Sequence, residues 1–105
     1  MKYMIEYKVR NAGLSHDQNL DNFEALLKVF GKWTPEEGLA VHAFVGNLSD
    51  GGYVLVEAAD PGIVLSFVAK FTAWNDVEVV PVIDIADVVG HSVQALAWDR
   101  AALTD

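Results

Sequence analysis

Hydrophobic and polar residues alternate at the start of the chain. Residues 2–10 keep this period of two, which predicts a β-strand with two unlike faces. One face carries Tyr3, Ile5, Tyr7 and Val9, and the other carries Met4, Glu6, Lys8 and Arg10. After a break at Asn11-Ala12-Gly13, helical spacing follows through Leu20, Phe23, Leu26, Leu27 and Phe30. Ser15 and Gln18 have the spacing of a capping box, and Gly31 predicts the end of this helix.

The middle of the chain predicts a β-hairpin. Residues 39–46 are rich in β-forming types and predict a strand. One of its faces should carry Leu39, Val41, Ala43 and Val45, and the other His42 and Phe44. Residues 47–52 contain Asp50-Gly51-Gly52, a turn signal, and residues 53–58 then predict a strand that pairs with the previous one in antiparallel fashion.

The last third predicts a helix, a strand and a second helix. Asp60-Pro61 supplies an N-cap and a proline in the first turn, and an apolar stripe follows through residues 63–71. Residues 77–83 are almost continuously apolar, which predicts a strand buried on both faces, with Pro81 favouring an edge or a bulge. From Asp84 onward, apolar residues recur at helical spacing as far as Leu103. They are Ile85, Val88, Val89, Val93, Leu96, Ala97 and Leu103.

This order of elements, βαββαβ plus a helix, predicts a single α+β domain over residues 1–105 with a ferredoxin-like fold. Two helices should cover one face of a four-stranded antiparallel sheet. The other face would still carry Met4, Phe44, Tyr53 and Leu55, which is too apolar to remain in water. We therefore expect a homodimer in which the sheet of a second copy covers this face.

Composition and charge exclude several classes of function. The formal net charge is −8, which disfavours nucleic acid and anionic membranes as partners. The chain lacks a transmembrane-length apolar run of about 18 residues and a signal-peptide pattern at its N-terminus, so we expect a cytoplasmic protein. Without cysteine there is neither a disulfide framework nor a thiolate nucleophile, and three scattered histidines predict no metal site. No cofactor is expected.

Residues 51–61, GGYVLVEAADP, and residues 77–82, VEVVPV, resemble a small bacterial family known as a domain of unknown function, DUF3303. Almost the whole chain also resembles the dimeric α+β barrel superfamily, in which two ferredoxin-like subunits pack sheet against sheet around a central pocket. The resemblance implies this fold and a homodimer, and it implies no activity. Other branches of the superfamily include cofactor-free monooxygenases, haem-binding and haem-degrading proteins and isomerases, but the chain shows none of their catalytic signatures.

Several polar residues are predicted to share the uncovered sheet face. Glu57 falls on the same side of its strand as Tyr53 and Leu55. Glu6, Lys8 and His42 could converge with Glu57 on this face, and a carboxylate beside an imidazole could transfer protons near neutral pH. The structural alternative is that Glu6 and Lys8 form an ion pair, Glu57 accepts hydrogen bonds at the strand end and His42 is simply satisfied. The candidate ligand-binding set is Glu6, His42, Phe44, Tyr53, Leu55 and Glu57, with His42 and Glu57 as catalytic candidates.

Three functions are compatible with these features. The leading hypothesis is a homodimer that binds a small neutral or aromatic molecule between its two sheets. The second is a cofactor-independent monooxygenase or isomerase that uses His42 or Glu57 as a base. The third is a purely structural dimer without a cavity. Asp84, Asp87 and His91 lie at helical spacing but indicate an acidic first turn more than a metal site. Trp33, Trp74 and Trp98 are expected in the core or at the dimer rim.

Overall fold

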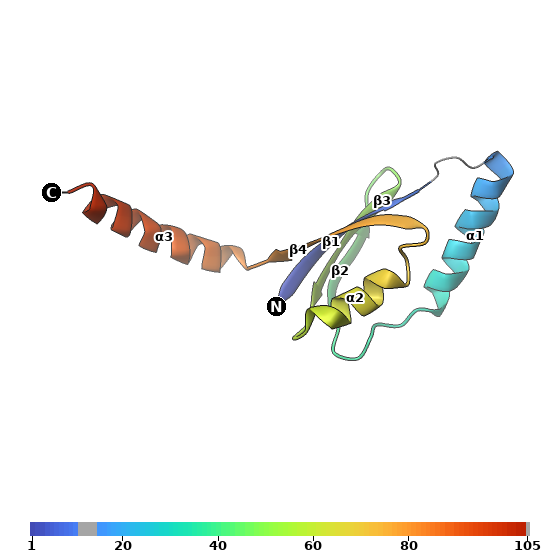
Figure 1. The fold of residues 1–105 in the computed structure, drawn as a ribbon, viewed down its shortest axis with the longest axis horizontal. Helices are drawn as coiled ribbons and strands as arrows, with labels where there is room; N and C mark the ends of the chain where they lie inside the picture. The colour runs from blue at the N-terminus through green and yellow to red at the C-terminus, as the bar shows by residue number, and fades with distance from the viewer. Residues whose placement is uncertain (11–14, 105) are drawn as a thin grey trace.

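The computed structural model describes residues 1–10 and 15–104. The four strands form one antiparallel sheet in the order β2-β3-β1-β4, which confirms the predicted α+β, ferredoxin-like arrangement (Figure 1). In chain order the elements are β1 (Lys2–Val9), α1 (His16–Lys32), β2 (Ala40–Gly46), β3 (Gly51–Glu57), α2 (Pro61–Ala69), β4 (Asn75–Val82) and α3 (Ile85–Ala102). The predicted break at Asn11-Ala12-Gly13 lies outside the described residues.

Two helices begin at the caps that the sequence predicts. The Ser15 hydroxyl accepts a hydrogen bond from the Gln18 amide, and the Gln18 side chain accepts one from the Ser15 amide, which completes the capping box of α1. At α2 the Asp60 carboxylate accepts from the amide of Gly62, and Pro61 occupies the first turn. Helix α1 ends at Lys32 with Trp33 as its C-cap, just beyond the predicted stop at Gly31.

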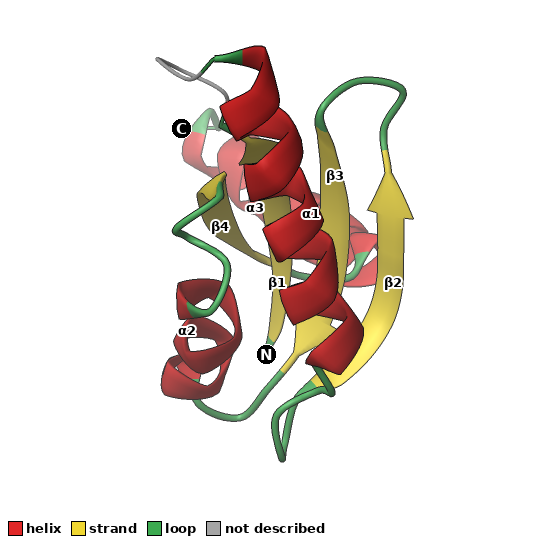
Figure 2. Cartoon of the chain, turned by 90° about the vertical axis from the view of Figure 1, so that its right-hand side faces the viewer, coloured by secondary structure: helices red, strands yellow, loops and turns green. Residues whose placement is uncertain are grey.

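Helices α1 and α2 lie on the same face of the sheet (Figure 2). The strand registers pair Ile5 with Val54 and Tyr3 with Val56, so these residues form the covered face, and the first and third strands follow the predicted alternation. The core between this face and the helices is small. It consists of Tyr3, Ile5, Leu26, Leu39, Val54, Val56, Ala58, Val64, Phe67, Val68 and Phe71.

A β-bulge corrects the predicted faces of β2. The register shifts between Val41 and Ala43, so that Ala43 lies opposite Leu55 and Phe44 lies opposite Val54. The extra residue reverses the alternation beyond His42, because two residues of β2 face one residue of β3 there. Phe44 therefore lies on the covered face, where its ring makes an edge contact with Phe30 at 5.4 Å between centroids. The sequence had predicted that Phe44 and His42 share one face of β2, and this prediction was wrong.

Two further predictions about the sheet were wrong. Gly51 and Gly52 belong to β3 and do not form the turn, which lies in residues 47–50. Strand β4 is an edge strand, as Pro81 suggested, but it is not buried on both faces: Val80 is 45% exposed. Its apolar run reflects surface that the single chain leaves uncovered.

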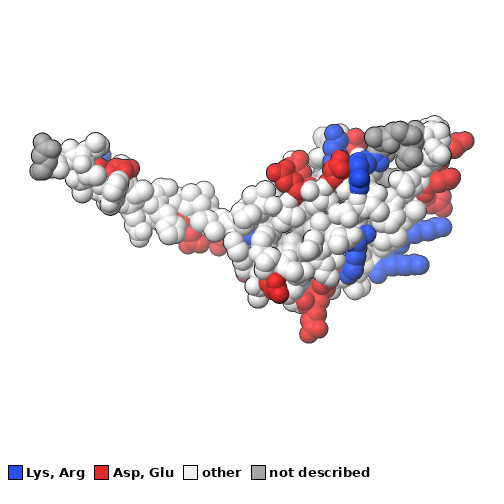
Figure 3. All heavy atoms as spheres, viewed as in Figure 1, with Lys and Arg blue, Asp and Glu red and all other residues white. Residues whose placement is uncertain are grey.

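Helix α3 projects away from the rest of the chain (Figure 1). None of its residues is buried, and the chain measures 70 × 31 × 21 Å with a radius of gyration of 19.2 Å. A compact domain of this length would have a radius of gyration of about 13 Å. The space-filling view shows few charged side chains on the visible surface of α3 (Figure 3). Among the described residues, no helix is long and apolar enough to span a membrane.

Candidate functional site

The face of the sheet opposite α1 and α2, which we call the open face, carries most of the predicted site residues. The registers place Met4 opposite Leu55, and Glu6 opposite Tyr53. Tyr53 is 42% exposed and Leu55 is partly exposed. The open face therefore combines apolar side chains with a few charged ones, as the sequence predicted.

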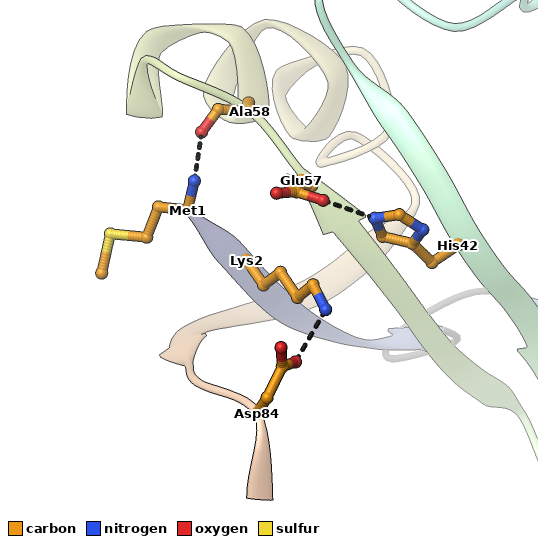
Figure 4. Close-up of polar contacts among 6 residues, drawn as sticks. All are labelled: Met1, Lys2, His42, Glu57, Ala58 and Asp84. Atoms are coloured by element: carbon orange, nitrogen blue, oxygen red, sulfur yellow. Dashed lines mark hydrogen bonds and ion pairs between the residues drawn. The ribbon is translucent and has the colours of Figure 1, made fainter. Parts of the chain in front are cut away.

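His42 and Glu57 form a direct pair on the open face (Figure 4). The Nε2 atom of His42 lies 2.8 Å from the Oε1 atom of Glu57. Both side chains are exposed, at 41% and 46%. The β2 bulge lies at His42, and Glu57 ends β3, so the pair joins neighbouring strands at one end of the sheet.

A second ion pair lies near the first and joins the start of β1 to the start of α3 (Figure 4). The Lys2 Nζ atom is 2.7 Å from the Asp84 Oδ1 atom. Asp84 occupies the N-cap position of α3, but its side chain makes no capping hydrogen bond. The N-terminal amine of Met1 donates to the Ala58 carbonyl oxygen at 3.0 Å, which fixes the start of β1 beside the end of β3. Lys2 therefore ties the base of α3 to the sheet.

These contacts shift the pKa values of the charged groups in the direction that favours their ionised forms. The hydrogen bond from His42, with the nearby positive charge of Lys2, lowers the pKa of the Glu57 carboxyl. The hydrogen bond from Lys2 lowers the pKa of Asp84, and the same contact raises the pKa of Lys2. At neutral pH Glu57 is thus a carboxylate, and its lowered pKa makes it a weaker base than an unpaired glutamate.

Glu6 and Lys8 do not join His42 and Glu57. The sheet register places Glu6 opposite Glu78 and Lys8 opposite Asp76, at the other end of the open face. The four residues line a shallow polar depression of about 290 Å³. The predicted Glu/Lys/His cluster is therefore split into two groups, and the location of Glu78 on the open face follows from the same register.

Asp84, Asp87 and His91, which share helical spacing, do not form a metal site in the part of the chain that the structure describes. Within residues 1–10 and 15–104, no three His, Asp or Glu side chains lie close enough to hold a metal ion. Asp87 and His91 lie on the projecting helix α3. Of the tryptophans, Trp33 and Trp74 pack against the core and Trp98 is 69% exposed on α3.

Lys2 and Asp84 are the site residues that sequence reasoning missed. Their signal lies in the pairing of β1 with β3, which places Lys2 opposite Glu57. The sequence predicts antiparallel strands but gives no direct sign that β1 lies between β3 and β4. Asp84 was interpreted, with Asp87, as part of an acidic first turn, because acidic residues are common at the start of a helix.

Comparisons with known proteins found a family match and a similar solved structure. Residues 1–96 match the family described as a domain of unknown function (DUF3303). A similar solved structure is described as the crystal structure analysis of SCO4226 from Streptomyces coelicolor A3(2). It is 18% identical, with a TM-score of 0.39, and the match covers 78% of this chain and 99% of that one. No curated protein matches the chain.

Proposed function

The chain belongs to the DUF3303 family, a domain of unknown function, and we propose that it acts as a homodimer that binds a small molecule between two facing sheets. Family membership brings no activity with it, so the proposal depends on surface, shape and charge. We also propose a cytoplasmic location, with which a chain that has no cysteine to form disulfides is compatible.

The main support for the proposed homodimer is that the chain exposes more surface than a compact monomer of its mass. The chain exposes 7566 Å² of accessible surface, whereas a compact monomer of its mass would expose about 5,800 Å². The difference of about 1,800 Å² per chain exceeds the roughly 800 Å² per partner that a standard stable interface buries. A second copy could bury this surplus.

The surplus surface is apolar and lies on two parts of the molecule. Along α3, apolar side chains repeat at helical spacing and stay in solvent. These are Ile85, Val89, Val93, Leu96 and Leu103, each at least 54% exposed. On the open face Val45, Tyr53 and Val80 are between 42% and 52% exposed. In a two-fold dimer each subunit uses the same surface, so the two open faces can cover each other while the α3 of each chain packs against its partner.

Such a dimer would turn the open face into the wall of an enclosed space. His42, Glu57, Tyr53 and Leu55 would line it from each subunit, with Glu6 at the far end. Apolar walls with a few polar groups are typical of pockets for small molecules. A small neutral or aromatic molecule fits this lining best, because the carboxylates of Glu57 and Glu6 would repel an anion.

The test compares one added charge on and off the apolar stripe of α3. We expect wild-type protein to sediment as a dimer and Val93→Glu to shift to monomer at the same concentration. Gln94→Glu adds the same charge at the next position, about 100° around the helix, and should remain dimeric. A monomeric wild type would rule out the dimer, and equal behaviour of the two variants would rule out the apolar stripe of α3 as its interface. If the wild type is a dimer that retains no small molecule in native mass spectrometry, the structural-dimer alternative is favoured over binding.

A second candidate function is acid–base catalysis, favoured by the 2.8 Å contact between His42 and Glu57. In an enclosed interface, an imidazole hydrogen-bonded to a carboxylate could remove a proton from an acidic carbon of a substrate. This is the chemistry of the cofactor-independent monooxygenase or isomerase that the sequence left open.

The pair can be tested by carbon-detected NMR titration of the Glu57 carboxyl group. We expect the pKa of Glu57 to lie below 4.5 in the wild type and to rise in His42→Ala, because the hydrogen bond that lowers it is removed. The matched control is His16→Ala, because His16 is exposed at the start of α1. This variant should leave the pKa of Glu57 unchanged. An unchanged pKa in His42→Ala would mean that the contact does not persist in solution, and the catalytic candidate would be withdrawn.

A further inference from the structure

A large cavity lies on the covered side of the sheet, between α1, α2 and the strands. Its volume is about 620 Å³, within the range of about 300–1,000 Å³ typical of small-molecule pockets. We propose that this cavity is a second binding site, one in each subunit, for a neutral aromatic molecule that carries a single hydrogen-bond donor. The site is distinct from the proposed space between two sheets, because the sheet itself separates them.

The cavity exists because α1 does not pack closely on the sheet. Leu26 is the only buried residue of α1, while Leu20, Phe23 and Leu27 are about half exposed although they also line the cavity. An amphipathic helix of this length normally buries its apolar stripe. A guest in the cavity would bury these side chains without moving the helix.

Aromatic rings make one end of the cavity suited to a flat guest. Phe30, Phe44, Phe67 and Phe71 line it and contact one another edge to face or at an inclined angle. The Phe67 ring also stacks on Trp33 with 4.6 Å between the ring centroids, which fixes its orientation. Aromatic walls favour aromatic guests through edge-to-face and offset contacts.

One polar atom in the cavity has a hydrogen-bonding capacity that the described protein does not use. The Oδ1 atom of Asn19 is shielded from solvent and has no hydrogen-bond partner among the described residues. A buried polar atom without a partner costs free energy, so such atoms usually have a partner in the functional state. Asn75, on the opposite wall, is different, because its Nδ2 donates to the Phe71 carbonyl at 3.0 Å. A rotation of the Asn19 side chain, which already lines the cavity, would bring Oδ1 to the cavity surface, where a guest with an N–H or O–H group could donate to it.

The charged groups around the cavity favour a neutral guest. The described lining contains Asp50 and no lysine or arginine, and the whole chain has a net charge of −8. Apart from the imidazole of His16, which is exposed at the start of α1, the described lining offers an anionic guest no basic side chain, and burying an unpaired charge is costly. A cation would have Asp50 at the rim but only apolar walls deeper in the cavity.

N-phenyl-1-naphthylamine is a suitable probe, because it is neutral, aromatic, carries one N–H group and fluoresces more strongly in apolar surroundings. We expect saturable binding of one probe per chain to the full-length protein. In Asn19→Leu the affinity should fall about fivefold through loss of one hydrogen bond. The matched probe 1-phenoxynaphthalene, which lacks the N–H group, should bind wild type and Asn19→Leu with similar affinity. An equal effect of Asn19→Leu on both probes would overturn the assigned role of Asn19.

A second pair of variants tests the location. Val77 lines the cavity, and Val79 lies on the same face of the same strand but outside the lining. Val77→Phe should fill part of the cavity and weaken probe binding at least tenfold, whereas Val79→Phe should bind as the wild type does. Intermolecular NOEs in the wild type, which need no variant, should connect the probe to the methyl groups of Leu26 and Val68. NOEs to Leu55 and Val45 on the open face instead, or no saturable binding, would overturn the proposal.

The same samples separate this inference from the proposed dimer. Sedimentation reports the number of subunits, and the NOEs report which side of the sheet holds the probe. A monomer with NOEs to Leu26 would support the cavity and refute the dimer, while a dimer with NOEs only to Leu55 would do the reverse. If the α3 of a second copy filled the cavity, NOEs would instead link Leu26 to Leu96 between differently labelled chains, and the small-molecule site would be rejected.

Discussion

Glu36 links three segments of the chain through one carboxylate. It lies in the connection between α1 and β2, and its side chain is only 11% exposed. It accepts hydrogen bonds from the Trp33 indole at 3.3 Å and from Lys70 at the end of α2. Burial alone would raise the pKa of Glu36, but these hydrogen bonds and the charge of Lys70 outweigh burial and lower it below 4.5.

This shift predicts how stability depends on pH at the scale of one residue. Because the pKa of Glu36 is lower in the folded state, its contribution is complete above the unfolded value of 4.5 and is lost as the pH falls through the folded value. Glu36→Gln should lower the free energy of unfolding by about 1 kcal/mol at neutral pH, since Lys70 is half exposed and its pairing is screened. The difference in the free energy of unfolding between wild type and Glu36→Gln should become smaller as the pH falls to about 3. Urea unfolding of both proteins at the two pH values checks this.

The neighbouring Glu37 is the control for that experiment, because it is exposed. Glu37→Gln should leave the free energy of unfolding unchanged at both pH values. If Glu36→Gln were destabilised equally at neutral pH and at about pH 3, the effect would come from packing and not from the charge of Glu36.

At the scale of elements, the hairpin of β2 and β3 depends on close backbone approach. A Cβ atom at Gly52 would collide with the carbonyl oxygen of Val45 on the adjacent strand. A Cβ atom at Gly31 on α1 would meet nothing within 4 Å. The same substitution should therefore have opposite effects in the two elements.

We expect Gly52→Ala to destabilise the protein by about 2 kcal/mol, because the backbone of β2 or β3 must move to relieve the collision. Gly31→Ala should stabilise it by about 0.5–1 kcal/mol, the ordinary gain from replacing glycine inside a helix. Thermal unfolding of the two variants beside the wild type measures both effects. If Gly52→Ala left the stability unchanged, β2 and β3 would be further apart than described.

The elements also show what sequence could and could not predict. Ser15, Gln18 and Asp60 predicted the helix starts, because capping depends on residues that are close in sequence. The side of Phe44 was predicted wrongly, because the bulge at His42 depends on pairing with β3 and leaves no local signal. The 2.8 Å contact of His42 with Glu57 was anticipated only as a shared face, since strand alternation gives sides but not partners. The absence of close packing beneath α1 had no signal at all, because its apolar stripe looks like that of any packed helix.

At the scale of the whole molecule, stability should depend on protein concentration. The described core contains eleven buried apolar residues for a chain of 105, while Leu96 and Trp98 on α3 and Leu103 at its C-cap remain in solvent. A chain that relies on a second copy to bury such surface unfolds together with its dissociation, so mass action favours the folded dimer at higher concentration.

Each tenfold increase in concentration should therefore raise the melting temperature of the wild type by about 3 °C, since it adds about 1.4 kcal/mol per dimer against the unfolding entropy of two chains. In Val93→Glu the melting temperature should be lower and independent of concentration, because a charge on the apolar stripe of α3 blocks association. Gln94→Glu, beside the stripe, should retain the wild-type slope. Scanning calorimetry over two decades of concentration measures all three. If the melting temperature of the wild type were high and did not change with concentration, the single chain would be stable with α3 in solvent. The exposed apolar surface would then need a partner other than a second copy.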